Sequence, residues 1–299
     1  KANLNELRLI NSDNKFNLKT EALVEVNGSN LEDLNGNIRF LNTTVTKNQK
    51  KYELKKFLLK AYSNNEKEKI LELQSDAVDA VLKGNLASGN LTEIITQKLA
   101  THLPSLFDKI VNAKATKLVQ NYELQIQFNK TAELTRLFFP DISVAENTRI
   151  NASFVAQTGG LNAQLNSSKL KLGPLSFYNI DLNADNAAQL SIKGNCNRLA
   201  LSDSSFVENV KLGLLIQKDS VRMQMGWNDL KPNNCHKANI KLEGLIHNAQ
   251  SLDAAILPSD FTLDDSVWVV PPGGRCSVDG RCIAVSNVVL QHNSRRVGA

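Results

Sequence analysis

Alternation of apolar and polar residues with a period of two recurs along most of this chain. Its clearest example is the stretch Asn121–Phe128, where the polar residues Glu123, Gln125 and Gln127 separate the apolar ones. The apolar residues of this stretch are Tyr122, Leu124, Ile126 and Phe128. Successive side chains of a β-strand point to opposite faces, so the pattern predicts a strand with one apolar and one polar side.

Similar segments fill most of the sequence, and connectors rich in Asn, Asp, Gly and Ser separate them. Residues 51–62 and 69–78 are two examples, each predicted as a single strand. The recurrence of these turn residues between the apolar segments predicts roughly fifteen to eighteen strands. The expected fold is mainly β: an elongated, curved antiparallel β-sheet that forms a hydrophobic groove and carries one amphipathic helical insert.

The segment 90–119 has a different period, because its apolar residues recur every three to four positions. The apolar residues of its first part are Leu91, Ile94, Ile95, Leu99, Leu103 and Phe107. Asn90 followed by Glu93 resembles a helix start, and Pro104 should kink or split the helix because it has no amide donor. A second short helix is predicted over residues 131–139. The chain therefore divides into strands (1–89), a helical insert (90–119) and strands again (120–299).

The helix is too short to cover the apolar face of such a sheet. About 30 helical residues span roughly 45 Å, whereas about fifteen strands stacked side by side span roughly 70 Å. Aromatic residues make up 6% of the chain, which leaves few large side chains for a second layer. Part of the apolar lining should therefore stay open to a ligand.

We expect two sets of residues to line this open face. The first set is Tyr122, Leu124, Ile126 and Phe128. The second set is Val221, Met223, Met225 and Trp227. The apolar residues of the helix are expected to lie in the groove as a plug.

No pattern typical of catalysis or metal binding appears in the sequence. The four histidines occur in no paired motif, and the Asp264–Asp265 pair is typical of a turn. The net charge of +5 is small, and the basic and acidic residues are interspersed along the chain. This pattern does not favour nucleic-acid binding. We therefore expect no enzyme activity, no cofactor and no metal site. An alternative, a carbohydrate-active β-helix enzyme, would need a cluster of carboxylates on one sheet face, which the sequence does not indicate.

The cysteines leave three alternatives open. Cys276 and Cys282 flank a predicted hairpin turn at Asp279–Gly280, which would suit a disulfide in an oxidising compartment. Free thiols are equally compatible with the sequence. A metal site is less favoured, because only one histidine, His236, lies near a cysteine in the sequence and no paired C-x-x-C occurs.

No apolar run in the sequence is long enough to span a bilayer as a helix. The chain begins and ends in strand-like segments, so we expect it to be part of a longer protein. An export signal or a membrane anchor would then lie outside this sequence.

The C-terminal region carries a resemblance to a known family. Leu263, Asp264, Asp265, Ser266 and Trp268, followed by the turn residues Asp279 and Gly280, resemble the strand modules of TamB translocation and assembly proteins of the Bacteroidetes type. The stretches 101–107 and 132–140 resemble inserts of the same proteins. The segment 271–282 departs from the pattern in its cysteines and glycines.

The resemblance implies membership of the AsmA-like group of elongated β-groove proteins, which has no catalytic residues to carry over. It implies a periplasmic protein, anchored to the inner membrane, whose groove binds or conducts the acyl chains of phospholipids or similar lipids between the two membranes. The alternative function is a scaffold or assembly factor for outer-membrane β-barrel proteins that acts by strand pairing.

Overall fold

The computed structural model describes residues 16–29, 33–47, 50–65, 68–84, 91–107, 121–186, 189–202, 204–229, 236–263, 265–280 and 282–298. The protein is mainly β, as its alternating sequence predicts, and the 22 strands found in these ranges form one antiparallel sheet. The strand count exceeds the predicted range of roughly fifteen to eighteen, and the predicted strand over residues 51–62 is one that is divided. The predicted strand at residues 3–10 lies outside the described residues.

Two compact units make up the chain, and each is described by itself below. Unit 1 comprises residues 1–89, 119–156 and 164–176, and unit 2 comprises residues 90–118, 157–163 and 177–299. The predicted third segment, 120–299, is divided between the units, because its first strand pairs with the N-terminal strands.

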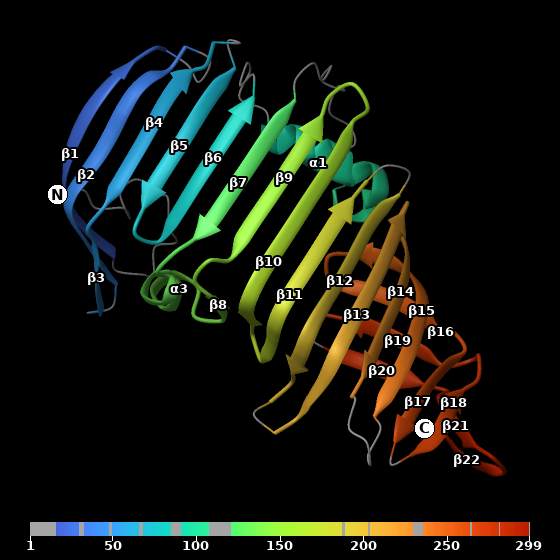
Figure 1. The fold of residues 1–299 in the computed structure, drawn as a ribbon. Coiled ribbons are helices and arrows are strands. Elements are labelled where there is room, and N and C mark those ends of the chain that lie inside the picture. The colour runs from blue at the N-terminus through green and yellow to red at the C-terminus, as the bar shows by residue number, and fades with distance from the viewer. Residues whose placement is uncertain are drawn as a thin grey trace. The chain divides into compact units, whose positions relative to one another are not determined.

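Seven strands of unit 1 pair with their neighbours in succession (Figure 1). They are β1 (Phe16–Asn27), β2 (Asn35–Lys47), β4 (Phe57–Ser63), β5 (Lys69–Ser75), β6 (Val78–Gly84), β7 (Tyr122–Phe128) and β9 (Arg149–Val155). The short strand β3 (Lys50–Leu54) pairs with the second half of β2. Strand β8 (Ile142–Val144) pairs with the end of β10 (Gly160–Leu172).

The prediction of one strand over residues 51–62 is wrong, because β3 ends before β4 begins. The break falls at Lys55 and Lys56, whose backbone amides both donate to Asp76 Oδ2, at 2.5 and 3.0 Å. The Asp76 amide in turn donates to the Lys56 carbonyl, at 3.3 Å. A carboxylate 20 residues away thus replaces the strand ladder at this point, which local alternation does not reveal.

In unit 2, four long strands pair in sequence order and the sheet then forks. The long strands are β12 (Leu190–Ala200), β13 (Phe206–Gln217), β14 (Ser220–Asn228) and β15 (Lys237–Asn248), and β11 (Leu175–Asp185) precedes them. The second half of β15 continues to β16 (Ser251–Ile256), β19 (Arg275–Asp279) and β20 (Cys282–Ser286). Its first half continues to β17 (Ser259–Leu263), β18 (Ser266–Val270), β21 (Val289–His292) and β22 (Arg295–Gly298).

Backbone contacts of Lys241 mark the fork. Its amide donates to Ser259 Oγ at 3.0 Å, and its carbonyl accepts the Leu257 amide at 2.9 Å. Because both groups of Lys241 bind the connection between β16 and β17, the two branches separate there with their backbone groups paired.

The helices agree with the sequence in position and differ in length. Helix α1 (Leu91–His102) begins at the first apolar residue of the predicted insert, and the 3₁₀ helix η1 (Pro104–Leu106) follows it. Pro104 therefore splits the predicted helix, as its missing amide requires. Residues 108–119, the rest of that prediction, lie outside the described part. Helix α3 (Ala132–Phe138) agrees with the second predicted helix.

Candidate functional site

The predicted lining residues of β7 lie on one face of unit 1 together with apolar residues of its neighbours. Leu124 lies opposite Leu82 of β6 and Ala152 of β9, and Ile126 lies opposite Ala80 and Ile150. Tyr122 and Phe128 share this face. The Tyr122 and Phe154 rings are tilted, with centroids 6.4 Å apart, and both side chains are buried. The intervening Glu123 and Gln125 belong to the other face.

The same apolar face continues over β5, β4 and β2. Leu71 lies opposite Leu82 and Ala61, and Leu73 lies opposite Ala80 and Leu59. Further along, Leu59 lies opposite Ile38, and Phe57 stacks on Phe40 with ring centroids 4.7 Å apart. Most of these side chains are half-buried although they are apolar. The register therefore extends the face that the sequence predicted for β7 over several strands of unit 1.

The second predicted set lies on the apolar face of unit 2. Met223 of β14 lies opposite Leu214 of β13 and Leu242 of β15, and Met225 lies opposite Leu212 and Ile240. Val221 lies opposite Ile216, and Trp227 lies opposite Ala238. All four predicted residues of β14 thus share a face with apolar residues of both neighbouring strands.

Helix α1 and η1 cover part of this face. Leu103, which joins them, forms a buried cluster with Leu190 of β12 and Ile216 of β13. Half-buried apolar residues pack around the cluster: Leu99, Phe107, Leu214, Val221 and Ile246. Three predicted plug residues therefore belong to this cluster or pack against it, namely Leu99, Leu103 and Phe107. Ile95 is half-buried, and the side chains of Leu91 and Ile94 lie outside the described part.

The apolar face of unit 2 also holds an apolar hollow of about 60 Å³. Its lining is Phe177, Ile180, Leu182, Gly194, Asn195, Cys196, Leu199, Val210, Leu212 and Met225. Burial raises the pKa of the Cys196 thiol, so this cysteine is held in its neutral, apolar form. Of the predicted residues, the hollow includes Met225. The sequence did not single out the others, because their contribution depends on register across four strands.

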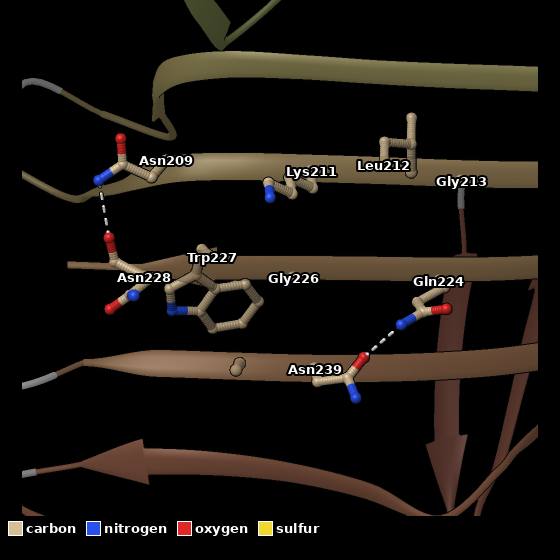
Figure 2. Close-up of a pocket in the computed structure, with 10 residues that line it drawn as sticks. Asn209, Lys211, Leu212, Gly213, Gln224, Gly226, Trp227, Asn228 and Asn239 are labelled. Atoms are coloured by element: carbon tan, nitrogen blue, oxygen red, sulfur yellow. Dashed lines mark hydrogen bonds between the residues drawn. The ribbon is translucent and has the colours of Figure 1, made fainter. Parts of the chain in front are cut away.

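A polar trough of about 460 Å³ is formed chiefly by residues of the opposite face of β13, β14 and β15. Gly213 and Gly226 leave room there, and amide side chains surround them (Figure 2). Gln224 Nε2 donates to Asn239 Oδ1 at 2.8 Å, and Asn209 Nδ2 donates to the Asn228 carbonyl at 2.8 Å. The first contact joins two side-chain amides, and the second joins a side-chain amide to a backbone carbonyl. Trp227, which the sequence predicted as a lining residue of the apolar face, is among the residues that line this polar trough, and the sequence analysis did not predict the trough itself.

A second polar pocket, of about 570 Å³, lies in unit 1 around Tyr52 and Asp76. Tyr52 is 5% exposed. Burial, and then the negative charges of Asp76 and Glu133, raise the pKa of its phenol, so the hydroxyl stays protonated. In the described ranges, no group of three or more His, Cys, Asp or Glu side chains is placed to hold a metal ion.

The hairpin β19–β20 forms as predicted, but the disulfide within it does not. Cys276 lies opposite Val285, and Cys282 lies opposite Asp279. The two cysteines therefore point to opposite faces of the hairpin, and a bridge between them would require the strands to shift. Both are free thiols, as is Cys196, and Cys235 lies outside the described residues.

Among the helices that the structure describes, none is both long and apolar enough to cross a membrane. No protein-family model, curated protein or solved structure matches this chain.

Proposed function

We propose that this protein binds the acyl chains of phospholipids or similar lipids on the apolar face of its sheet, and that this face forms a hydrophobic groove. The observation that supports the proposal is the register. In each unit it brings apolar side chains from several strands to one face, where most of them remain half-buried. An apolar surface of this kind, left partly exposed, is typical of a binding site.

Unit 2 adds a second line of support. Its apolar face already accommodates apolar side chains of α1, and an apolar hollow lies on the same face. Methylene groups of an acyl chain would fill such a surface, and each buried methylene contributes about 0.8 kcal/mol. The charged head group would stay in water, because burying an unpaired charge is costly.

The protein would act passively, by giving acyl chains an apolar path while the head groups remain solvated. From the family resemblance we also propose that it acts in the periplasm, between the inner and outer membranes. An inner-membrane anchor would be supplied by a segment outside this sequence.

Site-specific photocrosslinking tests the proposal. A photoreactive phenylalanine is placed at Ile126 of β7 or at Met225 of β14, and the protein is mixed with vesicles of phosphatidylethanolamine and phosphatidylglycerol. We expect lipid adducts, detected by mass spectrometry, at both positions, because both side chains belong to apolar faces.

Matched controls come from the neighbouring residues Gln125 and Gln224, which lie on the opposite faces of the same strands. We expect these positions to give few adducts. A folded protein without adducts at Ile126 and Met225, or with equal yields on both faces, would show that the apolar faces do not bind lipid.

Strand pairing with outer-membrane proteins is the second candidate function. It is favoured by β20, whose five residues are all exposed, including Ile283 at 71% and Val285 at 55%. An exposed apolar strand is a template for pairing with another chain. Capture of unfolded β-barrel proteins that is lost on Val285→Pro, with no lipid adducts at Ile126 or Met225, would favour this function over the first.

A further inference from the structure

Helix α1 and η1 occupy part of the surface that we propose for acyl chains. Strand β13 shows this directly, because the apolar residues at every second position of this strand lie on one face. Val210, which is buried, and Leu212, which is half-buried, line the hollow. Leu214 and Ile216, further along the same strand, pack in the cluster with Leu103. One row of side chains therefore runs from the hollow to residues that a segment of the chain itself covers.

A single turn fastens this cover to the sheet. Asp219 lies in the β13–β14 turn with a positive φ of 65° and is 9% exposed. Its carboxylate accepts the Ser105 amide, at 3.1 Å to Oδ1 and 3.2 Å to Oδ2. Its own amide donates to the His102 carbonyl at 2.9 Å. Asp219 thus satisfies an unpaired carbonyl at the end of α1 and an unpaired amide at the start of η1.

Neighbouring contacts strengthen the same attachment. Ser105 Oγ donates to the Ile246 carbonyl at 3.1 Å, and the Ile246 amide donates to the Asp219 carbonyl at 2.9 Å. The end of β15 is therefore tied to both the cover and the turn. We call this set of contacts of Asp219, Ser105, His102 and Ile246 the latch.

The sheet face beneath the cover makes apolar contacts that an acyl chain can reproduce. Leu103 of the cover is buried in one cluster with Leu190 and Ile216 of the sheet, and methylene groups could take its place there. Apolar burial is non-directional, so exchanging one apolar occupant for another has a small effect on the sheet itself. The latch contacts are the directional part of the attachment, and a lipid does not replace them.

We propose that α1 and η1 form a displaceable cover that competes with acyl chains for the face of β12, β13 and β14, and that the latch holds the cover closed. This inference rests on the proposed function, because it concerns access to the same surface. A chain whose latch is broken binds lipid over the covered residues as well as in the hollow.

Asp219→Gly tests the latch in the full chain. Glycine adopts the positive φ of this turn and keeps the backbone hydrogen bonds, so the change removes the carboxylate alone. Lys218→Gly is the matched control, because Lys218 is the exposed neighbour in the same turn and also has a positive φ, of 49°. Both variants are first compared with the parent protein by hydrogen exchange of the α1 amides, which reports opening of the cover.

Lipid access is then mapped with vesicles that contain a phosphatidylglycerol carrying a diazirine in its acyl chain. After illumination and proteolysis, mass spectrometry assigns adducts to the covered residues Leu214 and Ile216 or to the uncovered Met225. In Asp219→Gly we expect faster hydrogen exchange of the α1 amides. We also expect roughly tenfold more adduct at the covered residues, because losing a hydrogen bond to a charged acceptor changes an equilibrium by about that factor. Adduct at Met225 should stay unchanged, and Lys218→Gly should match the parent protein.

The outcomes separate the two proposals. No adduct at Met225 or at the covered residues in any variant means that the proposed function fails. Adduct at Met225 with unchanged exchange of α1 in Asp219→Gly means that the latch does not hold the cover. Adduct at Met225 with faster exchange but no gain at Leu214 and Ile216 means that the cover does not compete with lipid, and either of the last two results overturns this inference alone.

Discussion

At the scale of single residues, the end of α1 depends on groups that lie far apart in the sequence. His102 is buried beside the turn that carries Asp219, and that turn also binds its carbonyl. Burial, and then the positive charge of Lys98, lower the pKa of the His102 imidazole below its ordinary value of 6.5. The folded protein therefore holds this histidine neutral near pH 7.

A pH dependence of stability follows from this direction. Below the ordinary imidazole pKa of 6.5 the unfolded chain takes up a proton that folded His102 resists, so the unfolded state gains stability as the pH falls. The stability is complete above that pH and declines toward the lower folded pKa. We expect the free energy of unfolding, measured with denaturant between pH 7.5 and 5.5, to fall less in His102→Gln than in the parent protein. Equal slopes in the two proteins would show that burial does not affect His102.

At the scale of elements, the sequence was sufficient where local pattern determines the structure. The period-two alternation of Tyr122–Phe128 predicted both a strand and its apolar face, and register confirms that its neighbours share this face. Pro104 predicted the split between α1 and η1. The position of α1 on β12, β13 and β14 was not predictable, because its decisive contact joins Ser105 to Asp219, 114 residues later. The hollow of unit 2 was missed for a similar reason, since it needs the register of four strands.

The break between β3 and β4 gives a prediction at this scale. Asp76→Ala removes the acceptor of two backbone amides, those of Lys55 and Lys56, and leaves both without their partner. Hydrogen bonds to a charged acceptor contribute about 1.5–3 kcal/mol, and partial exposure of the site places the expected loss of unfolding free energy at about 1–2 kcal/mol. Chemical denaturation measures it. Asp141→Ala, an exposed aspartate of the same unit, is the control, and an equal effect of both changes would mean that Asp76 does not stabilise the break.

At the scale of the whole molecule, charges of both signs are interspersed along the chain, and in β7 and β14 the pleat of the sheet separates polar from apolar side chains. The 35 basic and 30 acidic residues are interspersed along the chain, so charged residues form no long block of one sign, and the net charge is +5. In β7 and β14 the polar residues Gln125, Gln127, Arg222 and Gln224 alternate with the apolar set. Apolar contact, rather than long-range attraction, should therefore determine how tightly a lipid binds.

Calorimetry of a short-chain lysophospholipid, below the concentration at which it forms micelles, tests this expectation. Burial of acyl methylenes on the apolar faces should give a negative heat-capacity change, seen as a binding enthalpy that becomes more favourable with temperature. Raising the salt concentration from about 0.1 to 0.5 M should change the affinity by less than about threefold, since the Debye length is already near 10 Å at the lower value. Zwitterionic and anionic head groups should bind alike. A steep loss of affinity with salt, or a strong preference for the anionic head group with no heat-capacity change, would mean that charged side chains hold the lipid and that the apolar faces do not.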